Sequence, residues 1–218
     1  CKVYYKSNNK DNFLECDIVL SAVGVETNIK NIGLENVEII SENGKINVDD
    51  YYQTNIDGIY AIGDIVKGPA LAHVASAEGI ICVEKISGLN PSILDYDNIP
   101  YCTYCNPEVA SVGFTEKEAI DLGYEINVGK FPFSASGKAN VSGHPDGFVK
   151  VIFDKKYGEW LGCHMIGYNV TEMIAEVVAA RKLETTAYEI IKTIHPHPTM
   201  SEAIMEATAA AYNKGIHL

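Results

Sequence analysis

The sequence has no long apolar run and few basic residues, and each absence excludes a class of protein. No apolar stretch approaches the roughly 18 residues of a membrane-spanning helix, so we expect no membrane span. Lysine and arginine number 17 against 29 aspartate and glutamate, which gives a formal net charge of −12. Nucleic acids and acidic membrane surfaces are bound by clustered cations that neutralise phosphates. The composition therefore argues against both partners.

Cysteine is present, but not in a pattern that organises the chain. The six cysteines are irregularly spaced over 218 residues, which excludes a disulfide framework and favours a reducing compartment such as the cytoplasm. Cys102 and Cys105 form a C-x-x-C, but no second pair completes a zinc site. A redox C-x-x-C needs a strand-to-helix turn, whereas this one lies in a stretch typical of extended chain. We interpret the two as unrelated buried thiols.

The first hundred residues combine turns, short strands and one helix. Residues 2–24 predict a strand, a turn and a second strand, and the apolar runs 18–25 and 58–64 are typical of strands buried on both faces. Apolar residues recur at helical spacing from near Leu71 to Gly88, which predicts a helix. The segment 91–100 has two prolines and no periodicity, so we interpret it as a linker.

The rest of the chain is typical of an antiparallel sheet with helices. Extended chain is predicted for 102–114, a short helix for 115–123, strands for 124–133, 147–154 and 159–167, and helices for 171–182 and 201–213. Strands followed by helices favour a sheet that helices cover on one side. We therefore expect an α/β chain whose C-terminal domain is of the α+β class.

One candidate binding site is the Gly-Asp that ends the apolar run 58–64. Gly63 lets a ligand approach the backbone closely, and Asp64 offers an acceptor for sugar or polyol hydroxyls. The helix that begins near Leu71 directs its free N–H groups toward the same region, which favours an electron-rich group. The alternative is an ordinary strand–loop–helix connection in which Asp64 is only a turn residue.

A second candidate is the segment I-H-P-H-P-T, in which two histidines alternate with two prolines before an apolar-periodic helix. His197 precedes Pro198, which biases it to extended backbone, and Thr199 to Glu202 has the T-x-x-E form of a capping box. The positive helix end disfavours an imidazolium there, whereas contact with Glu202 favours it. Such a balance suits general acid–base chemistry. Two other interpretations remain open: Glu202 only caps while both histidines pack, or both histidines bind a metal, although no third ligand is placed.

Both candidates belong to a series of segments that resembles one enzyme family. In chain order these segments are CDIVLSAVG, TNIDGIYAIGD, PALAHVASAEG, PEVASVGFTE, PFSASGKA, GFVKVIF and IHPHPTMSEA. Together they resemble the C-terminal half of the flavin-dependent pyridine nucleotide-disulfide oxidoreductases, over essentially all 218 residues. The doubled histidine of H-P-H-P-T is most similar to the branch that oxidises protein-bound dihydrolipoamide.

The resemblance implies roles for residues of both candidates. Asp64, after Gly63, would bind the ribityl chain of FAD, and the start of the following helix would face the pyrimidine edge of the flavin through Leu71, Ala72 and His73. His197 would be the acid–base residue, paired with Glu202, while His195 would be a neighbour and not the base. No metal ligand is implied.

The resemblance also implies a domain organisation. Residues 1–25 would be the end of an NAD-binding domain, 26–98 a central FAD-contacting segment and 99–218 a dimerisation domain. Gly24 ends the family's A-x-G, at a contact with the nicotinamide nucleotide, but Val25 follows where the family usually has arginine. No G-x-G-x-x-G and no C-x-x-x-x-C occurs in the chain, so we expect the ADP-binding lobe and the redox disulfide to lie upstream.

The implied function is oxidation of protein-bound dihydrolipoamide with NAD, through FAD and a redox disulfide. His197 would serve the disulfide of the second subunit of a homodimer. The partner would be the lipoyl domain of a 2-oxo-acid dehydrogenase complex or of the glycine cleavage system. Another disulfide reductase, of the glutathione or mercuric type, is one alternative. A non-catalytic dimerisation fragment is the other, since we expect these 218 residues alone to be inactive.

Overall fold

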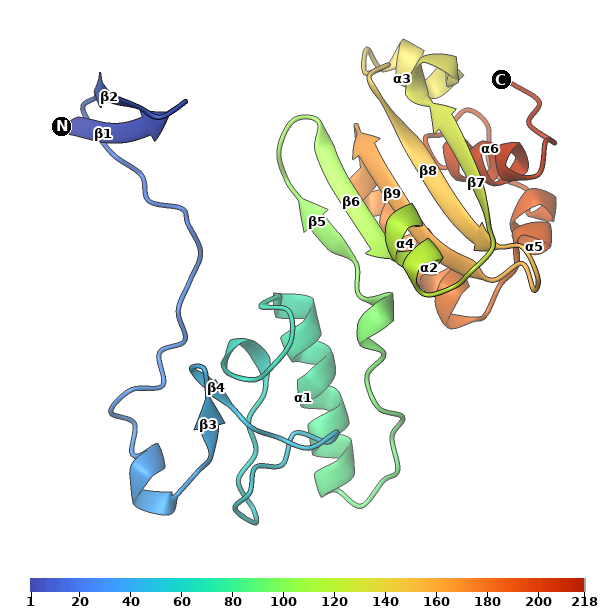
Figure 1. The fold of residues 1–218 in the computed structure, drawn as a ribbon. Coiled ribbons are helices and arrows are strands. Elements are labelled where there is room, and N and C mark those ends of the chain that lie inside the picture. Colours follow the sequence, from blue (N-terminus) through green and yellow to red (C-terminus); the bar gives the residue numbers. More distant parts are fainter. Residues whose placement is uncertain (218) are drawn as a thin grey trace. The chain divides into compact units, whose positions relative to one another are not determined.

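The computed structural model describes residues 1–217, and these form two compact units (Figure 1). The first unit is Cys1–Ile93 and the second is Leu94–Leu218. The division between them falls inside the segment 91–100 that the sequence analysis interprets as a linker. Within residues 1–217, no helix is both long and apolar enough to cross a membrane.

The second unit is built on a five-stranded antiparallel sheet in the order β5-β6-β9-β8-β7. Its strands are β5 (Tyr101–Thr103), β6 (Glu108–Gly113), β7 (Ile126–Pro132), β8 (Gly147–Asp154) and β9 (Trp160–Gly167). The central pair β8–β9 runs in register from Gly147 opposite Gly167 to Phe153 opposite Trp160, with a bulge between Ile152 and Phe153. The predicted extended chain at 102–114 is thus two strands, which a turn separates.

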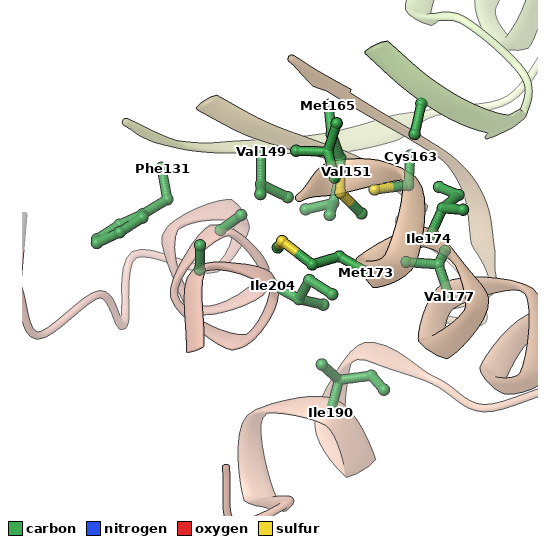
Figure 2. Close-up of a cluster of buried hydrophobic side chains, with 14 of the residues drawn as sticks. Phe131, Val149, Val151, Cys163, Met165, Met173, Ile174, Val177, Ile190 and Ile204 are labelled. Atoms are coloured by element: carbon green, nitrogen blue, oxygen red, sulfur yellow. The ribbon is translucent and has the colours of Figure 1, made fainter. Parts of the chain in front are cut away.

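Helices of different length cover the two faces of this sheet. They are α2 (Glu116–Asp121), α3 (Gly137–Val141), α4 (Val170–Lys182), α5 (Ala187–Lys192) and α6 (Glu202–Ala211). Residues of α4, α5 and α6 form the main core with side chains of β6 to β9 (Figure 2). The short helix α2 lies on the other face, where Ala119 packs with Ile152 and Leu161. Alternation along the strands explains the two cores, since neighbours such as Val151 and Ile152 point to opposite faces.

The helix α6 is held closely against β7 and β8, and this contact positions the residues discussed below. Gly129 of β7 faces the helix, and a Cβ at that position would lie only 1.9 Å from the carbonyl oxygen of Ala207. The sheet therefore approaches the helix backbone more closely than a side chain at position 129 would permit. Ile204 and Ala207 of α6 are fully buried in the core.

The first unit contains little regular structure. β1 (Lys2–Ser7) and β2 (Lys10–Glu15) form the predicted hairpin, β3 (Ser41–Glu42) and β4 (Lys45–Ile46) form a second short pair, and α1 spans Ala72–Ile86. Single-turn 3-10 helices lie at Leu34–Val37 and Gly63–Ile65. A third, Tyr96–Asn98, opens the second unit. The small core of the first unit gathers around Ile46, Ala61 and Val66.

Two predicted strands of the first unit are wrong. Residues 18–25 form no strand, and Ile18, Leu20 and Val23 are 84%, 86% and 95% exposed. In the segment 58–64, Tyr60 forms only an isolated bridge with Gln53. A strand needs neighbours to take its backbone hydrogen bonds, and no strand in residues 1–217 pairs with 18–25.

The thiols and two short helices also differ from the predictions. Cys105 is exposed and Cys102 is half-buried, so they are not a pair of buried thiols, although all six cysteines are free as expected. Helices α3 and α5 were not predicted, because five or six residues are too few to show a helical period. Helix α5 begins at a capping box formed by Thr186 and Glu189, a signal that is legible in the sequence.

Candidate functional site

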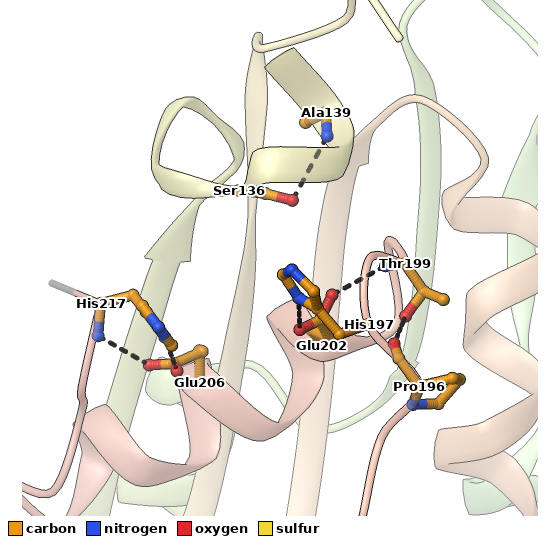
Figure 3. A network of polar contacts seen from close by, with 8 residues as sticks. All are labelled: Ser136, Ala139, Pro196, His197, Thr199, Glu202, Glu206 and His217. Carbon is orange, nitrogen blue, oxygen red and sulfur yellow. Dashed lines mark hydrogen bonds and ion pairs between the residues drawn. The ribbon is translucent and has the colours of Figure 1, made fainter. Parts of the chain in front are cut away.

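His197 and Glu202 form a hydrogen-bonded pair at the start of α6 (Figure 3). Nδ1 of His197 lies 2.8 Å from Oε1 of Glu202. The histidine side chain is 78% exposed and the glutamate side chain 25%. Because an ionised carboxylate only accepts hydrogen bonds, Nδ1 carries the proton and Nε2 is left with a lone pair that faces outward.

The segment before α6 holds this pair in place by a different arrangement from the predicted capping box. The helix begins at Glu202 and not after Thr199, and its N-cap residue Ser201 makes no side-chain cap. The backbone N–H of Thr199 donates to Oε2 of Glu202 over 2.7 Å, while the Thr199 hydroxyl donates to the carbonyl of Pro196 over 2.7 Å. Half of the capping box is therefore present. Both carboxylate oxygens of Glu202 are used, one by the backbone and one by His197.

These contacts determine the charge of Glu202. Burial raises the pKa of its carboxyl, but the hydrogen bonds from the Thr199 N–H and from His197 outweigh burial, so the pKa lies below its ordinary value. Glu202 is thus an anion at neutral pH. An anion at this position orients the imidazole and stabilises the cation that forms when Nε2 takes a proton.

His195 occupies a different environment from His197, although both lie between prolines. Its side chain is 5% exposed, Nε2 lies 2.8 Å from Oε1 of Glu176 on α4, and Nδ1 lies 3.1 Å from the carbonyl of Thr193. Both ring nitrogens face acceptors, so both must donate. The hydrogen bond to Glu176 raises the pKa of His195 above its ordinary value, against the effect of burial. His195 is a cationic link between α4 and this segment, and no group of metal-binding side chains is found in residues 1–217.

A small pocket lies beside the His197–Glu202 pair. Its volume is about 60 Å³, and it is lined by Phe131, Ala135, Ser136, Gly137, His197, Glu202, Glu206 and His217. Neither Glu206 nor His217 is predicted from the sequence to belong to this site. Glu206 follows Glu202 by four residues and so shares its helix face, which was a usable signal. No sequence signal indicates that His217 folds back onto the same face.

The flavin-type candidate lies in the first unit and centres on Gly63. Gly63 has a φ of 74°, which favours glycine, and a Cβ there would approach the Cβ of Ala75 to 3.2 Å. Its N–H donates over 2.6 Å to Oε2 of Glu78, a residue of α1 that is 1% exposed. Glu78 was not predicted as part of this site. It ties the Gly-Asp turn to the helix, so that Asp64 stands exposed at the surface.

The remaining predicted residues of the first unit lie around this turn. Leu71 is the N-cap residue of α1, and Ala72 and His73 are exposed in its first turn. Gly24 has a φ of 115° and open space around its missing Cβ.

A cavity of about 570 Å³ connects the Gly-Asp turn with the region after Gly24. It is lined by Val25, Glu26, Thr27, Ile29, Lys30, Asn43, Gly44, Lys45, Asp64 and Ala70. Nζ of Lys45 donates to the backbone carbonyl of Asp64, which leaves that carboxylate unconstrained by this lysine. The cavity thus places two carboxylates, Glu26 and Asp64, and two lysines around one space, a set of donors and acceptors suited to a polar ligand.

Comparisons with known proteins assign both regions of the chain to one enzyme family. Residues 99–208 match the dimerisation domain of the pyridine nucleotide-disulphide oxidoreductases, and residues 2–79 match the pyridine nucleotide-disulphide oxidoreductase family. A dihydrolipoyl dehydrogenase of Rhizobium etli is 52% identical over 209 residues, which is 95% of this chain and 44% of that protein. One from Bacillus subtilis is 53% identical over 199 residues, or 91% of this chain and 42% of that protein.

Solved structures resemble the chain in the same way. The crystal structure of LpdA from Mycobacterium tuberculosis matches with a TM-score of 0.85 and 26% identity, over 90% of this chain and 43% of that one. The Cu(II) complex of RclA, an HOCl-induced flavoprotein disulfide reductase of Escherichia coli, matches with a TM-score of 0.87 and 26% identity, over 95% and 47%. The chain spans less than half the length of each relative. It belongs to the pyridine nucleotide-disulphide oxidoreductase family, and its residues 99–208 form the dimerisation domain of that family.

Proposed function

We propose that the chain is the C-terminal part of an enzyme that oxidises protein-bound dihydrolipoamide with NAD, through FAD and a redox disulfide. The observation that carries this proposal is the His197–Glu202 pair, with its 2.8 Å hydrogen bond, within the region that matches the dimerisation domain. The similarity of about half of all positions to dihydrolipoyl dehydrogenases supports the choice of substrate.

His197 acts as the acid–base residue in this proposal. Its Nε2 takes the proton of a substrate thiol, so that the resulting thiolate can attack the enzyme's disulfide. Glu202 keeps the ring in the tautomer that leaves Nε2 basic, and it stabilises the imidazolium until the proton is returned. Since the His197 side chain is 78% exposed, we propose that its Nε2 serves the disulfide of the other subunit in a homodimer.

The residues of the first unit fit part of an FAD site. Gly63 adopts a φ of 74° and lets α1 pack closely against the turn. In this proposal the exposed Asp64 accepts hydrogen bonds from ribityl hydroxyls, and Leu71, Ala72 and His73 present a helix start to an electron-rich ring edge. When bound, FAD would carry electrons between the disulfide and NAD. We propose that Gly24 lies at the NAD contact, with Val25 in place of the family's usual arginine.

The domain assignment and partners complete the proposal. Residues 1–25 are proposed to be the end of the NAD domain, 26–98 the FAD-contacting segment and 99–218 the dimerisation domain. The partner would be the lipoyl domain of a cytoplasmic 2-oxo-acid dehydrogenase complex or glycine cleavage system.

Substitution of the base in the full-length protein tests the proposed reaction. His197→Gln keeps the side chain polar but removes the group that holds the proton, so dihydrolipoamide oxidation should fall by roughly 10²-fold to 10⁴-fold. The matched control is His144→Gln, because His144 belongs to the same unit and stacks on Tyr168 without facing Glu202. Wild-type turnover in the His197→Gln enzyme would refute the assignment.

A substrate panel separates the remaining alternatives. Full-length protein that reduces glutathione disulfide or Hg(II) faster than it oxidises dihydrolipoamide would be a different disulfide reductase of the same family. The 218-residue chain by itself should show neither flavin absorbance nor NADH-linked turnover, in line with a dimerisation fragment.

A further inference from the structure

A second Glu–His pair lies one helical turn from the first, on the same face of α6. Glu206 is 2% exposed and accepts three hydrogen bonds from the C-terminal segment, and Figure 3 shows the two that come from His217. The backbone N–H groups of Ile216 and His217 approach its Oε2 at 3.2 Å and 3.4 Å, and Nδ1 of His217 lies 2.5 Å from its Oε1. Burial of a carboxylate is costly unless hydrogen bonds compensate it, so these contacts bind the segment to the helix.

The two pairs share the pocket of about 60 Å³ described above, with His197 and Glu202 on one side and Glu206 and His217 on the other. Such a volume holds about two water molecules. The remaining walls, Phe131 of β7 and the stretch from Ala135 to Gly137, carry no ionisable group. The two imidazoles and two carboxylates therefore interact within one partly enclosed space.

Few other charges reach Glu202. Within α6 the nearest is Glu206, and from the preceding segment His195 interacts with it electrostatically. Charged residues of the neighbouring β7, β8 and α5 are engaged elsewhere: Lys130 with the ring of Phe148, Lys150 with Glu116, Asp154 with the backbone N–H of Tyr157, Glu189 with Thr186 and Lys192 with the ring of Tyr188. His217 is thus a basic side chain that only the folded-back C-terminal segment brings to this pocket.

We propose that Glu206 and His217 form a latch that holds the C-terminal segment on α6, and that His217 is thereby a positioning residue whose imidazolium stabilises the ionised form of Glu202. The inference rests on the proposed function for the role of His197. It adds that a residue fifteen positions after Glu202 maintains the charge of Glu202, on which the tautomer of His197 depends.

The position of His217 in the same pocket determines the direction of its effect on the pKa of Glu202. A positive group near a carboxyl favours its ionised form, and the charge of His217 contributes to holding the pKa of Glu202 below its ordinary value. Removal of His217 should therefore raise that pKa.

The test is a titration of Glu202 by ¹³C NMR in the 218-residue chain with labelled glutamate, which needs no turnover. In His217→Ala both the charge and the hydrogen bond are lost, whereas in His217→Asn the side-chain N–H can still donate to Glu206 without a charge. Both variants should move the Glu202 midpoint upward, because both remove the imidazole of His217. His144→Ala is the matched control and should leave the midpoint unchanged.

Each outcome decides one part of the proposal. An unchanged midpoint in His217→Ala overturns it. A rise in His217→Ala but not in His217→Asn overturns the electrostatic role, because the hydrogen bond alone then suffices.

Amide exchange tests the latch separately. Glu206→Gln should speed the amide exchange of Ile216 and His217 about tenfold or more, and unchanged exchange overturns the latch. If full-length wild-type protein does not oxidise dihydrolipoamide, the proposed function is refuted. The titration of Glu202 still tests the role of His217, because it does not depend on turnover.

Discussion

The close approach of β7 to α6 gives a prediction whose size follows from the structure. In Gly129→Ala the new Cβ would lie 1.9 Å from the carbonyl oxygen of Ala207 and 2.6 Å from the backbone N of Ala211. Real Cβ contacts are essentially never shorter than 3.0 Å, so the strand and the helix must separate by about 1 Å. Both contacts are with helix backbone, and no side-chain rotation can relieve them.

That separation would disturb a part of the main core. Ile204 and Ala207 of α6 are fully buried there, and overpacking of a core typically costs about 1–3 kcal/mol. We expect the free energy of unfolding of the second unit to fall by about 2–3 kcal/mol, near the upper end of that range, because the clash is with backbone. Urea unfolding followed by the fluorescence of Trp160, the single tryptophan, measures this directly.

A matched glycine in the same unit serves as the control. Gly137 lies in α3, and a Cβ there would meet nothing within 4 Å. Gly137→Ala should therefore leave stability unchanged or raise it by up to about 1 kcal/mol, since alanine loses less backbone entropy in a helix. Equal stability of Gly129→Ala and Gly137→Ala would refute the packing described for β7 and α6.

Two further predictions concern His195 and the cysteines. The pKa of His195 is raised by its hydrogen bond to Glu176, so the pair stabilises the fold fully below the ordinary histidine value of about 6.5 and less as pH rises through the raised value. His195→Gln should therefore lower the free energy of unfolding by about 1 kcal/mol at pH 5.5 and by less at pH 9, as measured by urea unfolding. A loss of stability that grows with pH would contradict the raised pKa of His195. Burial raises the pKa of the Cys163 thiol, whereas Cys105 is exposed, so a thiol reagent should modify Cys105 in the native protein and leave Cys163 unmodified until urea is added.

Much of the second unit could be predicted from local patterns. The strands β7, β8 and β9 and the helices α2, α4 and α6 lie within two residues of their predicted bounds, because each carries a clear apolar period or cap. Sheet order could not be predicted in this way. Strands β6 and β9 are neighbours in the sheet, with Val112 opposite Cys163. These residues are far apart in the chain, and no local sequence pattern indicates that they pair.

The first unit shows why a buried-strand pattern is an incomplete signal. The run 18–25 is apolar enough for a buried strand, but a strand also requires partners for its backbone and a surface on which to pack. No strand in residues 1–217 supplies either. By contrast, α1 forms as predicted because helix hydrogen bonds are satisfied within the segment itself.

For the candidate site, the sequence by itself determined that His197 and Glu202 lie close together, and the family resemblance indicated that they pair. Five residues, two flanking prolines and the start of a helix bring these side chains together locally. The tertiary structure alone decided how the two histidines differ: α4 delivers Glu176 to His195 and buries it, while His197 has no such neighbour and stays exposed. It also decided that His217 joins Glu206, since that contact requires the chain to reverse after α6. Local spacing can create a pair, but burial and charge around it come from segments that only the fold brings near.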